Sequence, residues 1–146
     1  MTPDMDSDEI KRLTGNLQDE RNGQALYEAL ATAEKDPRLA EVYRRFAEVE
    51  QRHGQAWAEK LLAAGAVVPR AKVTWRTSVL IWLARRWGAA LVVPTVAGIE
   101  RAASAGYNKQ DEAAAATMAP QEASHARLLQ QISQSDSGGL QGGQVA

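Results

Sequence analysis

Two short stretches decide the fold: EQRH at residues 50–53 and EASH at residues 122–125. Each places a glutamate three residues before a histidine, and residues at this spacing are neighbours on one face of an α-helix. The chain of 146 residues contains two histidines, and both stand in this arrangement. The two stretches therefore predict two helices that each present a carboxylate and an imidazole on the same side.

Around these stretches, apolar residues recur at three- and four-residue spacing, which predicts four long helices. We expect Ser7 or Asp8 to cap the first helix, and Asp36 with Pro37 to open the second. Pro94 should fall in the first turn of the third helix or kink it, and Pro120 should kink the fourth. The four predicted helices span about residues 7–34, 37–65, 89–108 and 109–133.

The composition agrees with an all-α protein and excludes several classes of function. Aromatic residues make up 5% of the chain and charged residues 24%, which is typical of helical rather than sandwich or barrel folds. The absence of cysteine excludes disulfides, zinc ribbons and cysteine nucleophiles. A net charge of −1 gives no reason to expect nucleic acid as a partner. The N-terminus lacks the apolar region of a secretory signal, and the longest uncharged apolar run, residues 88–99, is too short for a membrane span, so we expect a soluble domain.

Short connections within the first and second helical pairs, and a long one at residues 66–88 between the pairs, predict a ferritin-like four-helix bundle. We expect this bundle to occupy residues 7–134. Residues 135–146 are rich in Gly, Ser and Gln and predict a flexible linker tail, which would lead to a further domain.

Each predicted helix carries one glutamate within its apolar stripe. Four buried carboxylates that face one another would be very costly without cations, and divalent metal ions are the usual partners. Glutamates on all four helices, with histidines three residues after two of them, match the ligand pattern of di-iron and di-manganese carboxylate bundles. The predicted metal ligands are Glu20, Glu50, His53, Glu100, Glu122 and His125.

Two tyrosines follow glutamates by seven residues, which is two helical turns along the same face. Tyr27 follows Glu20 and Tyr107 follows Glu100, so each phenol could hydrogen-bond a metal-binding carboxylate. Packing at the end of the bundle explains the two tyrosines equally well. Both are therefore candidates for a supporting role rather than predicted ligands.

The chain resembles the rubrerythrin branch of the ferritin-like superfamily, and more closely the ferritin-like domain that precedes membrane domains in the vacuolar iron transporter family. The resemblance covers about residues 10–133 and rests on LQDERN (17–22), EKDPRLAEVY (34–43), FAEVEQRH (46–53), WLARR (82–86) and EASHAR (122–127). It differs from rubrerythrins proper, which carry a further glutamate where this chain has Ala97 or Ala103 and a four-cysteine site that is absent here.

The resemblance implies two iron ions per domain, with manganese as a possible replacement. Glu50 and Glu122 would bridge the ions, Glu20 and Glu100 would be terminal ligands, and each histidine would bind one ion. The implied activity is capture of Fe(II) and its oxidation with dioxygen or peroxide, in support of iron transport. The implied setting is a homodimer at the cytoplasmic face of a membrane, fused to or associated with a transporter domain.

Two other functions fit the same residues. A non-enzymatic sensor or relay would bind Fe, Mn or Co without turnover and regulate a fused transporter. A metal-free helical interaction domain would bind no metal at all. Metal analysis and oxygen or peroxide consumption distinguish the three.

The long connection is basic and rich in tryptophan. Between Leu61 and Ile99 the chain has five basic residues, no acidic residue and three of its four tryptophans. A short amphipathic helix is predicted here, with Leu80, Leu83 and Trp87 on one face. Residues 70–88 would either contact an anionic membrane surface or a partner, or simply cover the bundle or a dimer interface.

Overall fold

The computed structural model describes residues 5–145, with side chains described as far as residue 135. The described chain is all-helical, as predicted, and contains no strand. It divides into two compact units, Met1–Arg85 (unit 1) and Arg86–Ala146 (unit 2). Among the described residues, no helix combines the length and apolar character that crossing a membrane requires.

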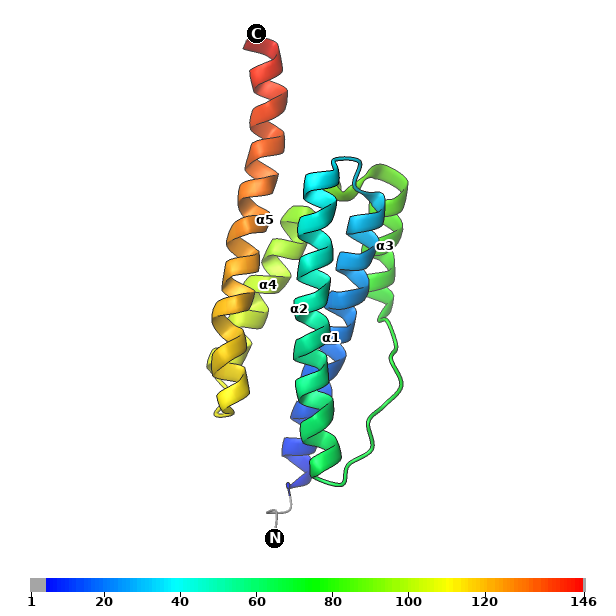
Figure 1. Cartoon of the computed structure of the whole chain (residues 1–146), viewed down its shortest axis with the longest axis vertical. Helices are drawn as coiled ribbons and strands as arrows, with labels where there is room; N and C mark the ends of the chain where they lie inside the picture. Colours follow the sequence, from blue (N-terminus) through cyan, green and yellow to red (C-terminus); the bar gives the residue numbers. More distant parts are fainter. Residues whose placement is uncertain (1–4, 146) are drawn as a thin grey trace. The chain divides into compact units, whose positions relative to one another are not determined.

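Unit 1 is built on a helical hairpin. Helix α1 spans Ser7–Ala33 and packs along α2, which spans Pro37–Ala63 (Figure 1). Asp36 caps α2 as predicted, because its side chain accepts a hydrogen bond from the Arg38 amide at 2.9 Å. This bond lowers the pKa of the Asp36 carboxyl below its ordinary value. The helix ends before Gly65, whose φ of 74° is the left-handed conformation that glycine adopts most readily.

The predicted cap of α1 is wrong by one or two residues. Asp6, rather than Ser7 or Asp8, is the N-cap, and its carboxylate accepts a hydrogen bond from the Glu9 amide at 2.8 Å. A carboxylate at the N-cap reaches the amide three residues later, so Ser7 becomes the first helical residue. The acidic first turn, Asp8 and Glu9, also suits the positive end of the helix dipole.

The core of unit 1 lies between the facing stripes of α1 and α2. The side chains of Leu13, Leu17 and Leu30 on α1, and of Trp57 and Leu61 on α2, are essentially without solvent contact. The rings of Tyr27 and Phe46 meet edge to face across the hairpin, with centroids 5.3 Å apart. The apolar spacing predicted Leu13, Leu17, Tyr27, Phe46, Trp57 and Leu61 as core positions, and all six are buried. Leu26 and Leu30, which are also buried, lie outside the predicted stripe.

The connection after α2 contains the predicted short helix, α3, at Trp75–Trp87. The long loop before α3 is hydrogen-bonded to α1 at three places. The Arg21 guanidinium donates to the Pro69 carbonyl at 2.6 Å, the Gln18 amide to the Lys72 carbonyl at 3.0 Å, and the Thr74 amide to the Asn22 side chain at 2.9 Å. The start of α3 is thereby held on the surface of α1.

Unit 2 contains a second hairpin. A 3-10 turn at Ala89–Leu91 leads into α4, Val93–Asn108, which packs against α5, Ala113–Val145. Pro94 falls in the first turn of α4, as predicted, where its missing N–H costs no helical hydrogen bond. Figure 1 shows α4 and α5 as consecutive helices joined by a short turn.

Helix α5 differs from the prediction at both ends. It begins at Ala113 instead of residues 109–111, and its helical backbone continues to Val145 instead of ending near Ser133. No proline follows Pro120, so every later residue keeps the backbone N–H that a continued helix requires. The side chains from residue 136 on lie outside the described part, and the linker expected at 135–146 stays a prediction. The helix assignment passes through Pro120 without a break, and the kink there also stays a prediction.

Candidate metal centre

The hairpin of unit 1 brings three of the predicted ligands together. Glu50 and His53 lie one turn apart on α2, and Glu20 lies on the facing stripe of α1. Each of the three side chains is at most 5% exposed, and each offers a ligand atom within 4.8 Å of the others. The His53 Nδ1 atom lies 3.3 Å from the Glu20 Oε1 atom, so α1 supplies the carboxylate that the imidazole of α2 faces. We call these three residues triad 1.

Gly23 makes room for one carboxylate of triad 1. It lies one turn after Glu20 on α1, and a Cβ atom built there would come within 3.2 Å of Glu50 Oε2. Such a contact is too close for a side chain at residue 23 unless Glu50 moves. Gly54, which follows His53, is different, since a Cβ there would make only ordinary contacts with Leu17 and Glu20 at 3.6 and 3.7 Å. The small residue at position 23 is therefore part of the geometry of Glu50.

The hairpin of unit 2 repeats the arrangement. Glu122 and His125 lie one turn apart on α5, and Glu100 lies on α4. The three side chains are again at most 5% exposed, with ligand atoms within 4.8 Å of one another. The His125 Nδ1 atom lies 3.7 Å from the Glu100 Oε1 atom. We call these residues triad 2.

The chemistry of both triads suits a divalent cation. Taking a carboxylate out of water is costly unless a positive group compensates it, and each triad contains two buried carboxylates. Carboxylate oxygen combined with imidazole nitrogen is the donor set that iron, manganese and similar first-row dications accept in proteins. These buried Glu and His groups could therefore hold a metal ion.

Next to triad 1, the pKa of the Asp19 carboxyl is raised, first by its partial burial and then by the nearby Glu20 carboxylate.

The positions of Tyr27 and Tyr107 are explained by packing in the core at least as well as by hydrogen bonds to the metal-binding carboxylates. Tyr27 is fully buried and its ring packs on Phe46, while Tyr107 is 5% exposed. Hydrogen bonds from these phenols to carboxylates stay a prediction. Sequence reasoning missed Tyr43, which is fully buried on α2. Its position seven residues before Glu50 was a usable signal, because seven residues bring a helix back to the same face.

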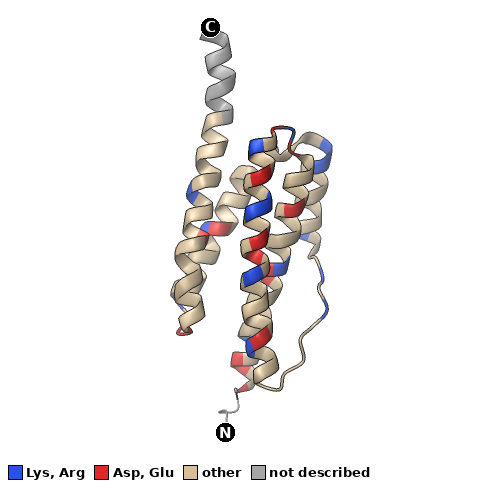
Figure 2. Cartoon of the chain, viewed as in Figure 1, with Lys and Arg blue, Asp and Glu red and all other residues tan. Residues whose placement is uncertain are grey.

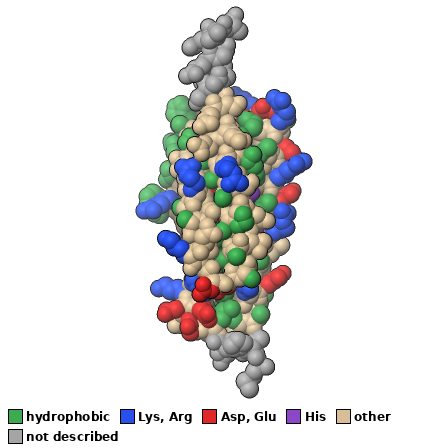
Figure 3. Space-filling model, turned by 90° about the vertical axis from the view of Figure 1, so that its left-hand side faces the viewer, with side chains coloured by type: hydrophobic (Ala, Val, Ile, Leu, Met, Phe, Trp, Pro, Cys, Tyr) green, Lys and Arg blue, Asp and Glu red, His purple; other side chains and the backbone are tan. Residues whose placement is uncertain are grey.

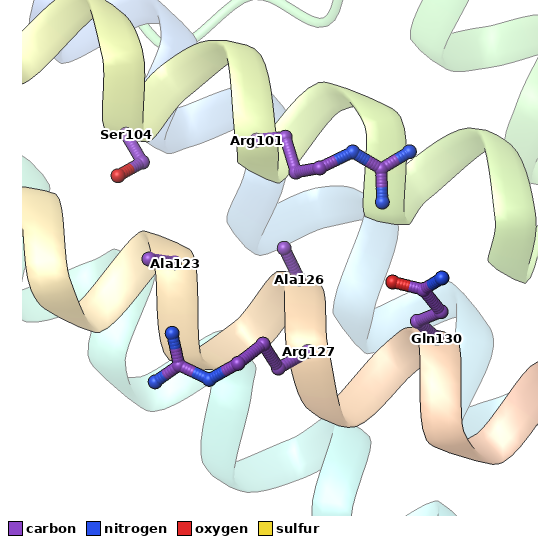
Figure 4. A pocket seen from close by; sticks show the side chains of 6 residues that line it. All are labelled: Arg101, Ser104, Ala123, Ala126, Arg127 and Gln130. Carbon is purple, nitrogen blue, oxygen red and sulfur yellow. The ribbon is translucent and has the colours of Figure 1, made fainter.

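Unit 2 also has a hollow between α4 and α5, with a volume of about 250 Å³. In Figure 4 the guanidinium of Arg101 lies toward Gln130 and that of Arg127 toward Ala123. Figure 3, which looks onto the α5 side, shows basic side chains near the middle of this face and acidic ones gathered at one end. The residues that line the hollow are Arg101, Ser104, Ala123, Ala126, Arg127 and Gln130.

This hollow is chemically unlike the triads. Its lining contains two guanidinium groups and no carboxylate, so it would repel a metal cation. Ser104 in its wall donates a hydrogen bond to the Ala119 carbonyl at 2.8 Å, which ties α4 to the turn of α5 just before Pro120. The metal-binding candidates are therefore the two triads, and the hollow lies outside them.

Comparisons with protein-family models, with curated proteins and with solved structures find no match.

Proposed function

We propose that the two triads together form one dinuclear iron centre in a ferritin-like four-helix bundle, and that this centre captures Fe(II) and oxidises it with dioxygen or peroxide. The observation that carries the proposal is the repetition of one buried donor set. Each hairpin pairs a glutamate on its first helix with a Glu-x-x-His motif on its second. A single metal ion would need only one such set, whereas two copies supply six protein ligands for two ions.

The proposed ligand roles are those that the resemblance implies. Glu50 and Glu122 would bridge the two ions, and Glu20 and Glu100 would each bind one. His53 and His125 would complete the two coordination shells. Two bound ions held near one another can both act on one small oxidant molecule.

The reaction balances with either oxidant. Two Fe(II) ions each give up one electron and become Fe(III). With dioxygen, the two electrons and two protons form hydrogen peroxide, and with hydrogen peroxide they form two waters. The buried carboxylates would stabilise the added positive charge of the ferric product, and the apolar core around them would exclude bulk water.

We place this activity in iron transport or homeostasis, on the resemblance to domains that precede iron transporters. In that setting the chain would lie at the cytoplasmic face of a membrane, as a homodimer, and supply or control the iron that an associated transporter moves.

An anaerobic Fe(II) titration of the chelator-stripped full chain tests the proposal, with metal analysis after desalting. Air or peroxide is then added and ferric absorbance is followed. We expect two irons per chain and oxidation faster than in buffer alone. The double variant Glu50→Gln/Glu122→Gln should lose both the bound iron and the faster oxidation. The control variant Glu48→Gln/Glu59→Gln removes two exposed carboxylates of unit 1, hence the same charge, and should keep both properties.

The same titration separates the other functions. If the chain binds two ions but does not accelerate oxidation, the result would indicate a metal sensor or relay for Fe, Mn or Co instead of an oxidase. No retained metal, with a melting temperature unchanged by chelator, would leave a metal-free helical interaction domain. Iron oxidation that survives Glu50→Gln/Glu122→Gln would contradict the assignment of the site.

A further inference from the structure

Helix α3 presents an apolar stripe to solvent. Trp75, Val79 and Trp82 follow one another at four- and three-residue spacing, and their exposed fractions are 72%, 45% and 60%. The opposite side of the helix is buried at Thr77 and Ala84. A helix whose buried side carries small residues and whose exposed side carries two tryptophans is oriented for contact with something outside the hairpin.

The surroundings of this stripe are positively charged. Arg86 continues the stripe one turn beyond Trp82, and Arg76 and Arg85 flank it. The Arg76 guanidinium lies 5.4 Å from the ring centre of Trp75, and that of Arg86 lies 4.4 Å from the ring of Trp87. No acidic residue occurs between Glu59 and Glu100. Figure 2 accordingly shows basic but no acidic positions along the loop and α3.

The helix is held in place before any partner arrives. Thr74, just before α3, donates its amide to Asn22 on α1 at 2.9 Å, and the Arg21–Pro69 and Gln18–Lys72 hydrogen bonds fix the loop that precedes it. Docking through α3 therefore avoids most of the entropy that ordering a free segment would cost.

These observations favour a lipid surface over a second copy of the chain. A symmetric contact of α3 with α3 would bring arginines against arginines, with no acidic residue of this segment to compensate them. An anionic bilayer offers the opposite charge, and tryptophan prefers the headgroup region, where its ring is apolar and its N–H can stay hydrated. The helix has 13 residues, too few to cross a bilayer but enough to lie in its interface.

We propose that α3 is a preformed docking surface for an anionic lipid bilayer, on which the helix lies flat with Trp75, Val79 and Trp82 in the headgroup region. The arginines around the stripe would bind lipid phosphates. This inference does not depend on the metal centre, so its test uses both the metal-free and the iron-loaded chain.

The test is cosedimentation with vesicles of phosphatidylcholine alone and with one third phosphatidylglycerol, together with tryptophan fluorescence. We expect binding to the anionic vesicles, a blue shift of emission, and weakening as salt is raised. The variant Trp75→Ala/Trp82→Ala should bind at least about tenfold more weakly, because binding strength scales with the apolar area buried. In the variant Arg76→Gln/Arg85→Gln, the affinity for anionic vesicles should fall roughly fivefold for each arginine removed.

Matched controls carry the same changes elsewhere on unit 1. Leu62→Ala/Val67→Ala removes exposed apolar side chains outside α3, and Lys35→Gln/Arg52→Gln removes two exposed charges. Both should bind within about twofold of the unaltered chain, and circular dichroism should show that all four variants are folded. Equal binding to neutral vesicles, or no binding to either kind, would overturn the proposal. So would a dimer seen by sedimentation that Trp75→Ala/Trp82→Ala dissociates, since the partner would then be a second copy.

Discussion

Unit 1 and unit 2 carry the same three donors on a helical hairpin but support them differently. In unit 1 the imidazole and carboxylate of the two helices are 3.3 Å apart, and Gly23 leaves room for Glu50. In unit 2 the corresponding atoms are 3.7 Å apart, and Ala103 stands one turn after Glu100 where unit 1 has glycine. The donor set is thus a repeated local motif, whereas the space around it is particular to each hairpin.

The two hairpins also differ in how their helices are made. Helix α2 starts at an aspartate cap, while α4 starts from a 3-10 turn without a side-chain cap. Helix α5 contains an interior proline, and the helices of unit 1 contain none beyond their first turn. These differences allow each hairpin to be perturbed separately.

The largest effect should come from removing one imidazole at a time. If each triad holds one ion, His53→Ala and His125→Ala should each reduce bound Fe(II) from two to one per chain, because each removes the only nitrogen ligand of one ion. Metal analysis after anaerobic loading and desalting measures this. Two irons retained in either variant would show that the corresponding triad does not bind an ion through its histidine.

The next largest effect concerns Pro120 in unit 2. An interior proline removes a helical hydrogen bond and crowds the carbonyl four residues earlier, at a cost of about 3 kcal/mol. We expect Pro120→Ala to raise the free energy of unfolding by about 1–3 kcal/mol in urea denaturation. If the proline bends α5 and thereby aims Glu122, iron affinity should fall in the same variant. Unchanged stability and affinity would mean that α5 accommodates the proline without a kink.

Gly23 tests how closely unit 1 fits its carboxylate. A methyl group at residue 23 would force Glu50 to move, and displacing the support of a metal ligand typically costs at least about tenfold in affinity. We expect this loss for Gly23→Ala by competition with a chelating dye. Gly54→Ala is the control, since its Cβ has ordinary contacts and alanine favours the helix. A loss of affinity in both variants would point to general disturbance of the hairpin instead.

The smallest effect concerns the cap of α2. The pKa of Asp36 is lowered in the folded state, mainly by the Arg38 amide, from an ordinary value of 3.8. A lowered pKa means that the charged carboxylate stabilises the fold above pH 3.8, and that this contribution is lost as the pH falls toward and through the lowered value. Asp36→Asn should therefore be less stable than the unaltered chain near neutral pH, with the difference closing in acid. Thermal unfolding from pH 7 to pH 3 measures it, with Asp111→Asn as the control; a constant difference across that range would contradict the lowered pKa.

Much of the helical structure and of the candidate site could be predicted from sequence because both depend on local spacing. Residues three and four apart share a helix face whatever surrounds them, so the Glu-x-x-His pairs and most of the core stripes were located correctly. The cap at Asp6 was missed because Asp6, Ser7 and Asp8 are all good capping residues, and only the backbone path selects among them. Tyr43 was missed because a tyrosine seven residues before a glutamate shares its helix face without any local motif that marks it.

Other features depend on segments that are distant in the chain, and sequence spacing contains no information about them. Only the packing of α1 on α2 shows that Glu20 lies beside His53. The same packing shows that Gly23 leaves space for Glu50. The sequence likewise shows that α3 contains tryptophans and arginines, but it does not show which side of the helix is exposed. That depends on the folded unit, in which hydrogen bonds between α1 and the preceding loop hold the start of α3. By itself the sequence determined the helices and their donors, because helical periodicity is local. The tertiary structure alone decided which donors meet and which faces stay exposed, because both depend on packing between distant segments.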